Sequence, residues 1–155
     1  MAFRSTIIIF VFAIICLLNY SSAAKPIGAV SAVVVYGEEL TNKDSGADLS
    51  DPYVKLWVDG NHKKQTTVKK NTLNPYWDET FVFNFFPGSH KLHVEVWDKD
   101  YNGDNDDLMG QAVIDLDNYC IPTAAAPVCD IGGIFAEFDD THLNYVVLDA
   151  KWHLF

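Results

Sequence analysis

Apolar and polar residues alternate along several short segments of this chain. The clearest is the segment 92–97, LHVEVW, in which Leu92, Val94 and Val96 fall on one side and the intervening residues on the other. A period of two residues, carried by β-branched and aromatic side chains, is typical of a strand with one buried face. The pattern therefore predicts a strand that contributes these three side chains to a hydrophobic core.

Similar patterns predict seven further short strands. Turn signals such as Asp59-Gly60 separate them, and the segment 118–140 is expected to be irregular, with a single helical turn within 132–140. Short strands with a turn about every 8–12 residues predict an all-β fold, an eight-stranded antiparallel β-sandwich. The further strands are expected at 29–36, 53–58, 65–69, 81–85, 112–116, 144–148 and 151–155.

The N-terminus has the layout of a secretory signal peptide. Arg4 precedes an apolar run at 7–18, and small residues follow as far as Ala24. A secretory signal peptide consists of a basic N-terminal region, a short apolar region and a cleavage site with small residues. The apolar run here is too short for an ordinary transmembrane helix. We expect residues 1–24 to be a signal peptide and residues 25–155 one domain of a secreted, extracellular protein. The alternative is a leader retained as an anchor.

Charge and cysteine content narrow the possible partners. The formal net charge is −10 at pH 7, and Arg4, the only arginine, lies in the expected signal peptide. An acidic chain of this kind is unsuited to general nucleic-acid binding. Cys120 and Cys129 remain after the signal peptide, and an even pair in a secretory protein predicts a disulfide bond. Two free thiols are the alternative.

The strand at 92–97 runs into a strongly acidic segment. Five carboxylates fall within the ten residues 98–107, and Lys99 is the only positive charge among them. Two carboxylates about 4 Å apart repel by roughly 4 kcal/mol at an effective dielectric constant near 20. Such a cluster is expected either to point into water or to surround a hard cation. Oxygen ligands on a loop suit Ca²⁺ better than a transition metal.

An EF-hand is one calcium-binding structure that such a segment suggests. Asp98-Lys99-Asp100-Tyr101-Asn102-Gly103 matches the first half of an EF-hand loop, but Met109 stands where the bidentate Glu belongs. The preceding residues also have strand periodicity, whereas an EF-hand requires a helix there. A site formed by two acidic loops at one end of a β-sandwich fits better, and a second acidic loop precedes the strand at 53–58.

The sequence resembles the C2 domain family at three motifs. These are SDPYVKLWVDG, TTVKKNTLNPYWDETFVFNF and LHVEVWDKDYNGDNDDLMGQ, and the likeness spans roughly residues 30–148. C2 domains are calcium-dependent phospholipid-binding β-sandwiches found in protein kinase C, synaptotagmins and perforin, and this chain is most similar to the C-terminal C2 module of perforin. The resemblance implies a C2-like sandwich with calcium-binding loops at one end.

The resemblance also implies a set of Ca²⁺ ligands. Asp51 in the first acidic loop matches a family ligand, as do Asp98 and Asp100 in the second. The first loop has a further candidate in either Asp44 or Asp48, because the family's usual position for it is occupied here by a serine.

One more ligand position in the second loop has two readings. Counting forward from Asp98 places it at Asp106, whereas counting back from Gly110 places it at Asp107. The second reading is favoured because the strand that follows fixes the register, and both residues remain candidates.

The function implied is calcium-dependent binding of an anionic phospholipid membrane. Leu49 and Tyr101 are candidates for membrane contact at the loop tips. The alternative is a secreted β-sandwich that binds a protein or glycan partner, with calcium structural or absent. The sequence contains no nucleophile or phosphate-binding motif, so no enzymatic activity is expected. One basic cluster is expected to be a solvated strand, with phosphoinositide or glycan binding as the alternative: Lys63, Lys64, Lys69 and Lys70.

Overall fold

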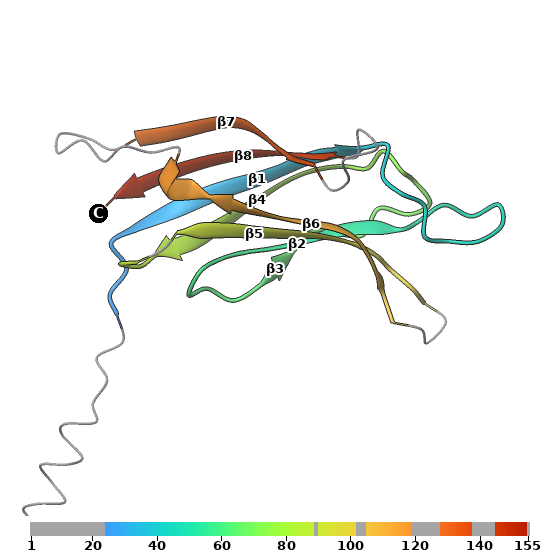
Figure 1. The fold of residues 1–155 in the computed structure, drawn as a ribbon, viewed down its shortest axis with the longest axis horizontal. Helices are drawn as coiled ribbons and strands as arrows, with labels where there is room; N and C mark the ends of the chain where they lie inside the picture. The colour runs from blue at the N-terminus through green and yellow to red at the C-terminus, as the bar shows by residue number, and fades with distance from the viewer. Residues whose placement is uncertain (1–23, 89, 102–104, 119–127, 138–144, 155) are drawn as a thin grey trace, which may run out of the picture.

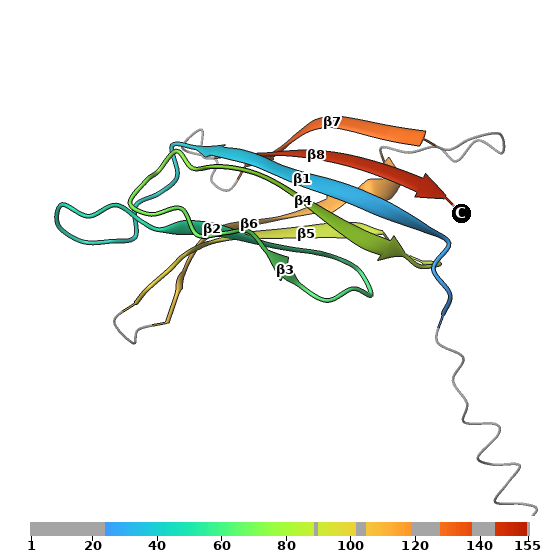
Figure 2. The same cartoon turned by 180° about the vertical axis from the view of Figure 1, so that it is seen from behind.

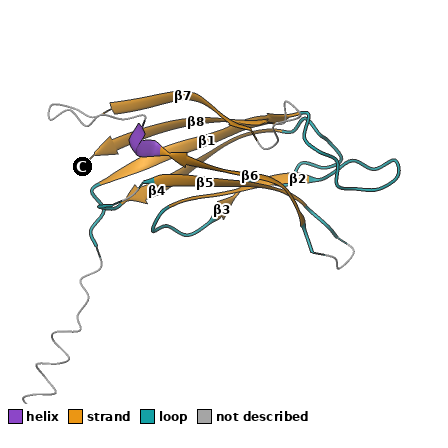
Figure 3. Cartoon of the chain, viewed as in Figure 1, coloured by secondary structure: helices purple, strands orange, loops and turns teal. Residues whose placement is uncertain are grey.

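The structure is a computed structural model that describes residues 24–88, 90–101, 105–118, 128–137 and 145–154. The described residues form eight strands and one short 3-10 turn, as Figure 3 shows. The strands are β1 (Gly28–Glu38), β2 (Pro52–Val58), β3 (Lys64–Gln65), β4 (Tyr76–Phe85), β5 (Lys91–Asp98), β6 (Asp107–Asp115), β7 (Val128–Glu137) and β8 (Tyr145–Leu154), with the turn η1 at Leu116–Asn118.

The strands form two four-stranded sheets that pack face to face (Figure 1). One sheet has the order β4-β1-β8-β7 and the other β3-β2-β5-β6, with antiparallel pairing throughout. Antiparallel sheets that bury one face and expose the other explain the alternating sequence pattern. The predicted antiparallel β-sandwich is confirmed.

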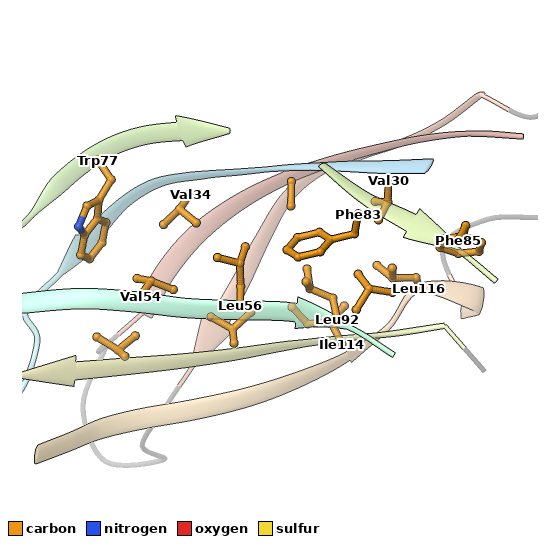
Figure 4. Close-up of a cluster of buried hydrophobic side chains, with 14 of the residues drawn as sticks. Val30, Val34, Val54, Leu56, Trp77, Phe83, Phe85, Leu92, Ile114 and Leu116 are labelled. Carbon is orange, nitrogen blue, oxygen red and sulfur yellow. The ribbon is translucent and has the colours of Figure 1, made fainter. Parts of the chain in front are cut away.

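The core lies between the two sheets, and Figure 4 shows side chains from both layers meeting there. Leu92, Val94 and Val96 are each fully buried, as their period of two predicts. Burying one such side chain contributes about 1.5–3 kcal/mol relative to leaving it exposed. Across from them, β4 contributes Phe83 and Phe85 to the same core.

Several predicted boundaries were wrong, and β3 is the clearest case. A strand was expected at 65–69, whereas the regular pairing with β2 covers Lys64 and Gln65 and continues only as single bonds from the Thr66 and Lys69 N–H groups, each 2.9 Å. Thr66 explains the early end of β3. Its hydroxyl accepts the hydrogen bond of the Val54 N–H at 2.9 Å, so a side chain replaces the carbonyl that a continuing strand would offer. A local side-chain acceptor of this kind competes with the sheet ladder.

The second half of the chain is more regular than expected. β7 occupies 128–137, so the expectation of irregular structure was wrong for these residues, while 119–127 and 138–140 lie outside the described part of the chain. The short turn lies instead at η1, where Leu116 is fully buried. The pairing of β7 with β8 shifts register between Ile131 and Ile134, across two glycines, and such an irregularity hides the period of two. The two closing segments form one continuous strand, β8.

Candidate functional site

The two acidic loops meet at one end of the sandwich. The β1–β2 loop, 39–51, leads into β2, and the β5–β6 loop, 99–106, leaves β5. β2 and β5 are antiparallel neighbours in which Pro52 pairs with Asp98, so the start of one strand lies beside the end of the other. Figures 1 and 2 show both loops projecting from the same end of the sandwich.

A cavity of about 290 Å³ opens between these loops. We call it the acidic cavity, because four of its lining residues are aspartates from the two loops. Leu49, Lys70, Asn71, Lys99 and Tyr101 complete the lining. The sequence-predicted residues that it brings together are Asp44, Asp48, Asp51 and Asp100.

Asp51 and Asp98 are held in place by backbone hydrogen bonds. The Asp51 N–H donates to Oδ1 of Asp98 at 2.6 Å, and the Asn71 N–H donates to Oδ1 of Asp51 at 2.6 Å. Asp98 is only 1% exposed, which is unusual for a carboxylate and requires such a partner. One oxygen of each carboxylate is thus fixed by an N–H group, and this sets the direction of the second.

The carboxylates repel one another across the cavity. The pKa of Asp44 is raised, first by loss of solvation and then by the negative charges of Asp98, Asp100, Asp48 and Asp51. All five aspartates therefore act on a common region, although they come from two loops. A cation placed there would relieve the repulsion.

Asp106 has a different environment. Its Oδ2 accepts a hydrogen bond from the Tyr53 hydroxyl at 2.6 Å, and its Oδ1 accepts one from the Lys99 ammonium at 2.7 Å. Both hydrogen bonds lower the pKa of Asp106, and the bond from Lys99 has the larger effect. The pKa of Tyr53 is correspondingly raised, chiefly by burial and then by the hydrogen bond to Asp106. Asp106 does not line the acidic cavity.

Asp107 lies on the same side of the sheet as Asp98. It is the first residue of β6 and pairs directly with Asp98 across the two strands, which places their side chains on one face. The pairing shifts between Val96 and Trp97, so Met109 is the extra residue of β6. Asp107 therefore lies beside Asp98, although neither of the two is among the residues that line the acidic cavity, and both candidates stay predictions.

The donor set suits a hard cation. The acidic residues around the cavity offer carboxylate oxygens, which Ca²⁺ accepts in flexible arrangements of six to eight ligands. Among the residues that the structure describes, no three His, Cys, Asp or Glu side chains are grouped closely enough to hold an ion as they stand. Binding would thus require the two loops to draw their carboxylates together.

Both predicted membrane-contact residues line the mouth of the cavity. Leu49 is 37% exposed and Tyr101 is 59% exposed. The Lys70 ammonium lies 4.7 Å from the centre of the Tyr101 ring and the Lys99 ammonium 5.9 Å from it, so two cations flank this aromatic side chain. Apolar and cationic groups are therefore available at the rim of an otherwise acidic site.

The predicted lysine cluster does not act as one unit. Lys63 forms an ion pair with Glu95 at 3.1 Å and lies 3.8 Å from the centre of the Trp57 ring. Lys64 donates a hydrogen bond to the Val82 carbonyl at 2.7 Å. Lys70 lines the acidic cavity, away from these contacts. Lys63 and Lys64 therefore have structural partners on β2, β4 and β5.

Sequence reasoning missed Asn71, which ties the β3–β4 loop to the first acidic loop. Its side-chain oxygen accepts a hydrogen bond from the Leu49 N–H at 2.7 Å, and its backbone N–H binds Asp51. Its φ of 53° is left-handed, a conformation that Asn tolerates better than most residues. An asparagine in a polar loop was the only available signal, and many asparagines have no such role.

The remaining predictions concern the chain ends. The expected signal peptide, apart from Ala24, and Cys120 lie outside the described residues, and the side chain of Cys129 is not described, so the disulfide stays a prediction. In the described part of the chain, no helix is long and apolar enough to cross a membrane.

Comparison with known proteins gives a consistent family assignment. The profile described as "C2 domain" matches residues 28–128. Synaptotagmin-1 of Homo sapiens is 43% identical over 86 residues, covering 51% of this chain and 20% of that protein. Synaptotagmin-3 of Arabidopsis thaliana is 38% identical over 96 residues, covering 60% of this chain and 18% of that protein. The match thus spans about a fifth of each relative.

A solved structure supports the same assignment. The C2A domain of plant Extended Synaptotagmin 1 superposes with a TM-score of 0.70 at 26% sequence identity, covering 84% of this chain and 98% of that one. The similarity to the C2 module of perforin is not tested by these matches and stays a prediction.

Proposed function

Because the chain belongs to the C2 domain family, we propose that it binds Ca²⁺ in the acidic cavity and thereby attaches to anionic phospholipid membranes. We further propose that it does so as a secreted, extracellular protein without enzymatic activity. The observation that carries the proposal is the convergence of four aspartates from two loops on one cavity.

Asp51, Asp98 and Asp100 are the residues that would hold the ion, with Asp107 beside Asp98 and with Asp44 and Asp48 in the first loop. When bound, Ca²⁺ would supply positive charge at the mouth of the cavity, where phosphate oxygens of a lipid can reach it. The protein's own contribution is to orient the carboxylates. The N–H groups of Asp51 and Asn71 perform this task by fixing one oxygen of Asp98 and one of Asp51.

The rim residues would contribute the remaining contacts with a membrane. Tyr101 combines an apolar ring with a polar hydroxyl, which suits the boundary between headgroups and lipid tails. Leu49 offers a smaller apolar contact, and Lys70 places a positive charge beside the tyrosine ring. Without bound Ca²⁺, the acidic loops would repel an anionic surface, so attachment is expected to depend on calcium.

The expected affinity fits an extracellular site. Calcium sites of extracellular modules typically have dissociation constants of about 10⁻⁴–10⁻³ M. A site in this range is largely occupied in a calcium-rich fluid outside the cell. Membrane attachment would then depend mainly on whether anionic lipid is accessible.

Liposome co-sedimentation of the full chain tests the proposal. The chain is mixed with anionic or neutral vesicles, in Ca²⁺ or in chelator, and the pelleted fraction is measured. We expect pelleting with anionic vesicles in Ca²⁺ only. Failure to pellet under any condition would contradict the membrane function.

Matched variants test whether the acidic cavity is responsible. Asp100→Asn removes one carboxylate charge from the cavity lining, and we expect it to raise the calcium concentration needed for pelleting about tenfold, the effect of weakening a metal site by one ligand or its support. Asp78→Asn makes the same change on β4, where the residue is exposed, and is expected to behave like the unaltered chain. Equal effects of both variants would argue for a general charge effect.

Binding of a protein or glycan partner is the alternative function. The outer face of β2 and β5 carries Trp57 stacked on His93 at 4.7 Å between ring centres, and the Lys55 ammonium lies 4.1 Å from the centre of the Trp97 ring. Aromatic side chains are enriched at protein interfaces. A chain that binds Ca²⁺ but no vesicle would favour this alternative.

A further inference from the structure

Asp106, the last residue of the β5–β6 loop, has a well hydrogen-bonded side chain. Three donors converge on it. These are the Tyr53 hydroxyl at 2.6 Å, the Lys99 ammonium at 2.7 Å and the Asp100 N–H at 3.3 Å. A carboxylate satisfied by three donors, one of them charged, is firmly held and has little tendency to turn toward another partner.

The partners of Asp106 lie on the outer side of the sheet. Val54 points into the core, so Tyr53, its neighbour in β2, points to the opposite face. Lys99 follows Asp98 and reaches the same face, since its ammonium meets the carboxylate that Tyr53 binds. The carboxylates that act on Asp44, by contrast, are Asp98, Asp100, Asp48 and Asp51.

The contact with Tyr53 anchors the acidic loop to β2. Tyr53 is only 3% exposed and belongs to a regular strand, so its hydroxyl is a fixed point. Asp106 connects this point to the end of the loop, and the Asp100 N–H connects the same carboxylate to the loop's beginning. Both ends of the loop that carries Asp100 are thereby restrained before any cation arrives.

The contact with Lys99 controls a positive charge beside the cavity. Lys99 lines the acidic cavity, yet its ammonium is paired with Asp106. If Asp106 carried no charge, this ammonium would be free to turn toward the carboxylates of the cavity that Lys99 also lines. A lysine paired with those carboxylates would compete with a bound cation.

We infer that Asp106 is a positioning residue that anchors the β5–β6 loop to Tyr53 and retains the Lys99 ammonium. The inference rests on the proposed function, because it concerns how the same cavity is prepared for Ca²⁺. It assigns to Asp106 a supporting role, whereas the sequence left this residue open as a Ca²⁺ ligand.

Calcium titration of full-chain variants by calorimetry tests the inference, with thermal unfolding in chelator measured alongside. Tyr53→Phe removes only the hydroxyl, and we expect it to weaken calcium binding several-fold, since support groups around a metal site typically contribute about 10–100-fold. Tyr76→Phe is the matched control, because Tyr76 is 63% exposed on β4 and far from the loop in sequence. The control is expected to bind calcium like the unaltered chain.

The opposite role for Asp106 predicts the opposite sign. If Asp106 were itself a ligand, removing the Tyr53 hydroxyl would release it from a competing bond, and calcium affinity would rise or stay unchanged. A rise or no change in Tyr53→Phe would therefore overturn the inference.

Lys99 provides an independent readout. Asp106→Asn is expected to weaken calcium binding about tenfold, and Asp106→Asn/Lys99→Gln to recover a measurable part of that loss, because the released ammonium is no longer present. A purely structural role would not predict recovery, since the second substitution adds no new support to the loop. Absence of recovery would overturn the role assigned to the lysine.

The outcome for the unaltered chain separates the two proposals. If the full chain gives no calorimetric response to Ca²⁺ and no thermal shift, the proposed function fails and this inference with it. If the full chain responds while Tyr53→Phe and Asp106→Asn respond equally well, only the role of Asp106 is wrong.

Discussion

Asn71 shows how one residue outside both acidic loops can organise them. Its side-chain oxygen binds the Leu49 N–H and its backbone N–H binds Asp51, while its φ of 53° lies in the left-handed region. Two separate properties, a left-handed conformation and a side-chain acceptor, are therefore required at this position. Gly supplies the first without the second, and Ala supplies neither.

Substitution of Asn71 separates these two contributions. Asn71→Gly is expected to lower the free energy of unfolding by about 1 kcal/mol, because the Leu49 N–H loses its acceptor. Asn71→Ala is expected to lower it by about 1 kcal/mol more, since a Cβ is unfavourable in the left-handed conformation. Urea denaturation of both variants gives the values. Equal stabilities would show that the backbone at this position relaxes.

The pKa of Asp44 predicts a pH-dependent stability effect. Because the folded-state pKa is raised, the folded chain binds a proton more readily than the unfolded chain, and stability contributed by this group is lost as pH rises through the folded pKa. Asp44→Asn removes the repelling charge. We expect the variant to unfold at a higher temperature than the parent at neutral pH in chelator, and the difference to vanish below about pH 4.

Calcium should reduce the stability advantage that the same substitution gives in chelator. With the ion present, Asp44→Asn is expected to gain less stability from Ca²⁺ than the parent does, because one oxygen donor of the first loop is lost. The comparison needs only thermal scans in chelator and in Ca²⁺. A parent chain that is the more stable one in chelator would contradict the repulsion inferred from the geometry.

The sequence could predict part of the site at this scale. Asp51, Asp98 and Asp100 flank strands whose ends meet, so their proximity follows from strand pairing. The sequence also favours Asp107 over Asp106 as a ligand, from the register of the strand that follows. It does not show that Met109 is the extra residue of β6 or that Asp106 binds a tyrosine hydroxyl 53 residues away in sequence. Neither feature can be predicted from a local sequence pattern.

Among the elements, β4 is notable because it forms an edge of its sheet. Exposed edges carry unpaired backbone groups and invite association with other chains. The Asn61 side chain covers one position of this edge. It donates to the Asn84 carbonyl at 2.8 Å and accepts from the Asn84 N–H at 3.0 Å, which are the two bonds that a neighbouring strand residue would form.

Loss of the Asn61 carboxamide is expected to destabilise the chain and expose the edge. Asn61→Ala should lower the free energy of unfolding by about 1–2 kcal/mol, since two backbone groups lose their partners. Asn61→Asp keeps a side-chain oxygen that accepts the Asn84 N–H bond. It removes the side-chain NH₂ group, so the Asn84 carbonyl loses its donor. Urea denaturation measures stability, and sedimentation velocity measures association. Unchanged values for Asn61→Ala would mean that water serves the edge equally well.

Prediction of the elements succeeded where the period of two was regular. Leu92 to Val96 gave the correct strand and the correct buried face, because one face packs in the core and the other meets solvent. It failed at β3, where the Thr66 hydroxyl ends the ladder, and at β7, where a register shift interrupts the pattern. Both failures come from interactions between segments distant in sequence, which no local window contains.

At the scale of the whole molecule, the residues of the hydrophobic core and those of the proposed binding site lie in different parts of the sandwich. Its core lies between the sheets, whereas the acidic cavity lies at one end, on loops that carry few of the core residues. The antiparallel pairing of β2 with β5 connects the two regions, because it brings together loops 47 residues apart. A ligand of the loops therefore stabilises the fold by mass action without altering the core.

This separation predicts that calcium and the core contribute independently to stability. A ligand that binds only the folded chain at about 100 times its dissociation constant adds about 2.7 kcal/mol to the free energy of unfolding. Leu56→Val shortens a fully buried side chain of β2 and is expected to cost about 1 kcal/mol. Because Leu56 does not line the cavity, the gain in free energy of unfolding on adding Ca²⁺, the calcium increment, should be the same in this variant as in the parent. Asp100→Asn should lose most of this increment while keeping the core intact. Chemical denaturation of the three chains, each in chelator and in Ca²⁺, yields both quantities. A calcium increment that changes with Leu56→Val would mean that cation binding alters the packing between the sheets, and the loops could then no longer be treated as a separate binding unit on a fixed sandwich.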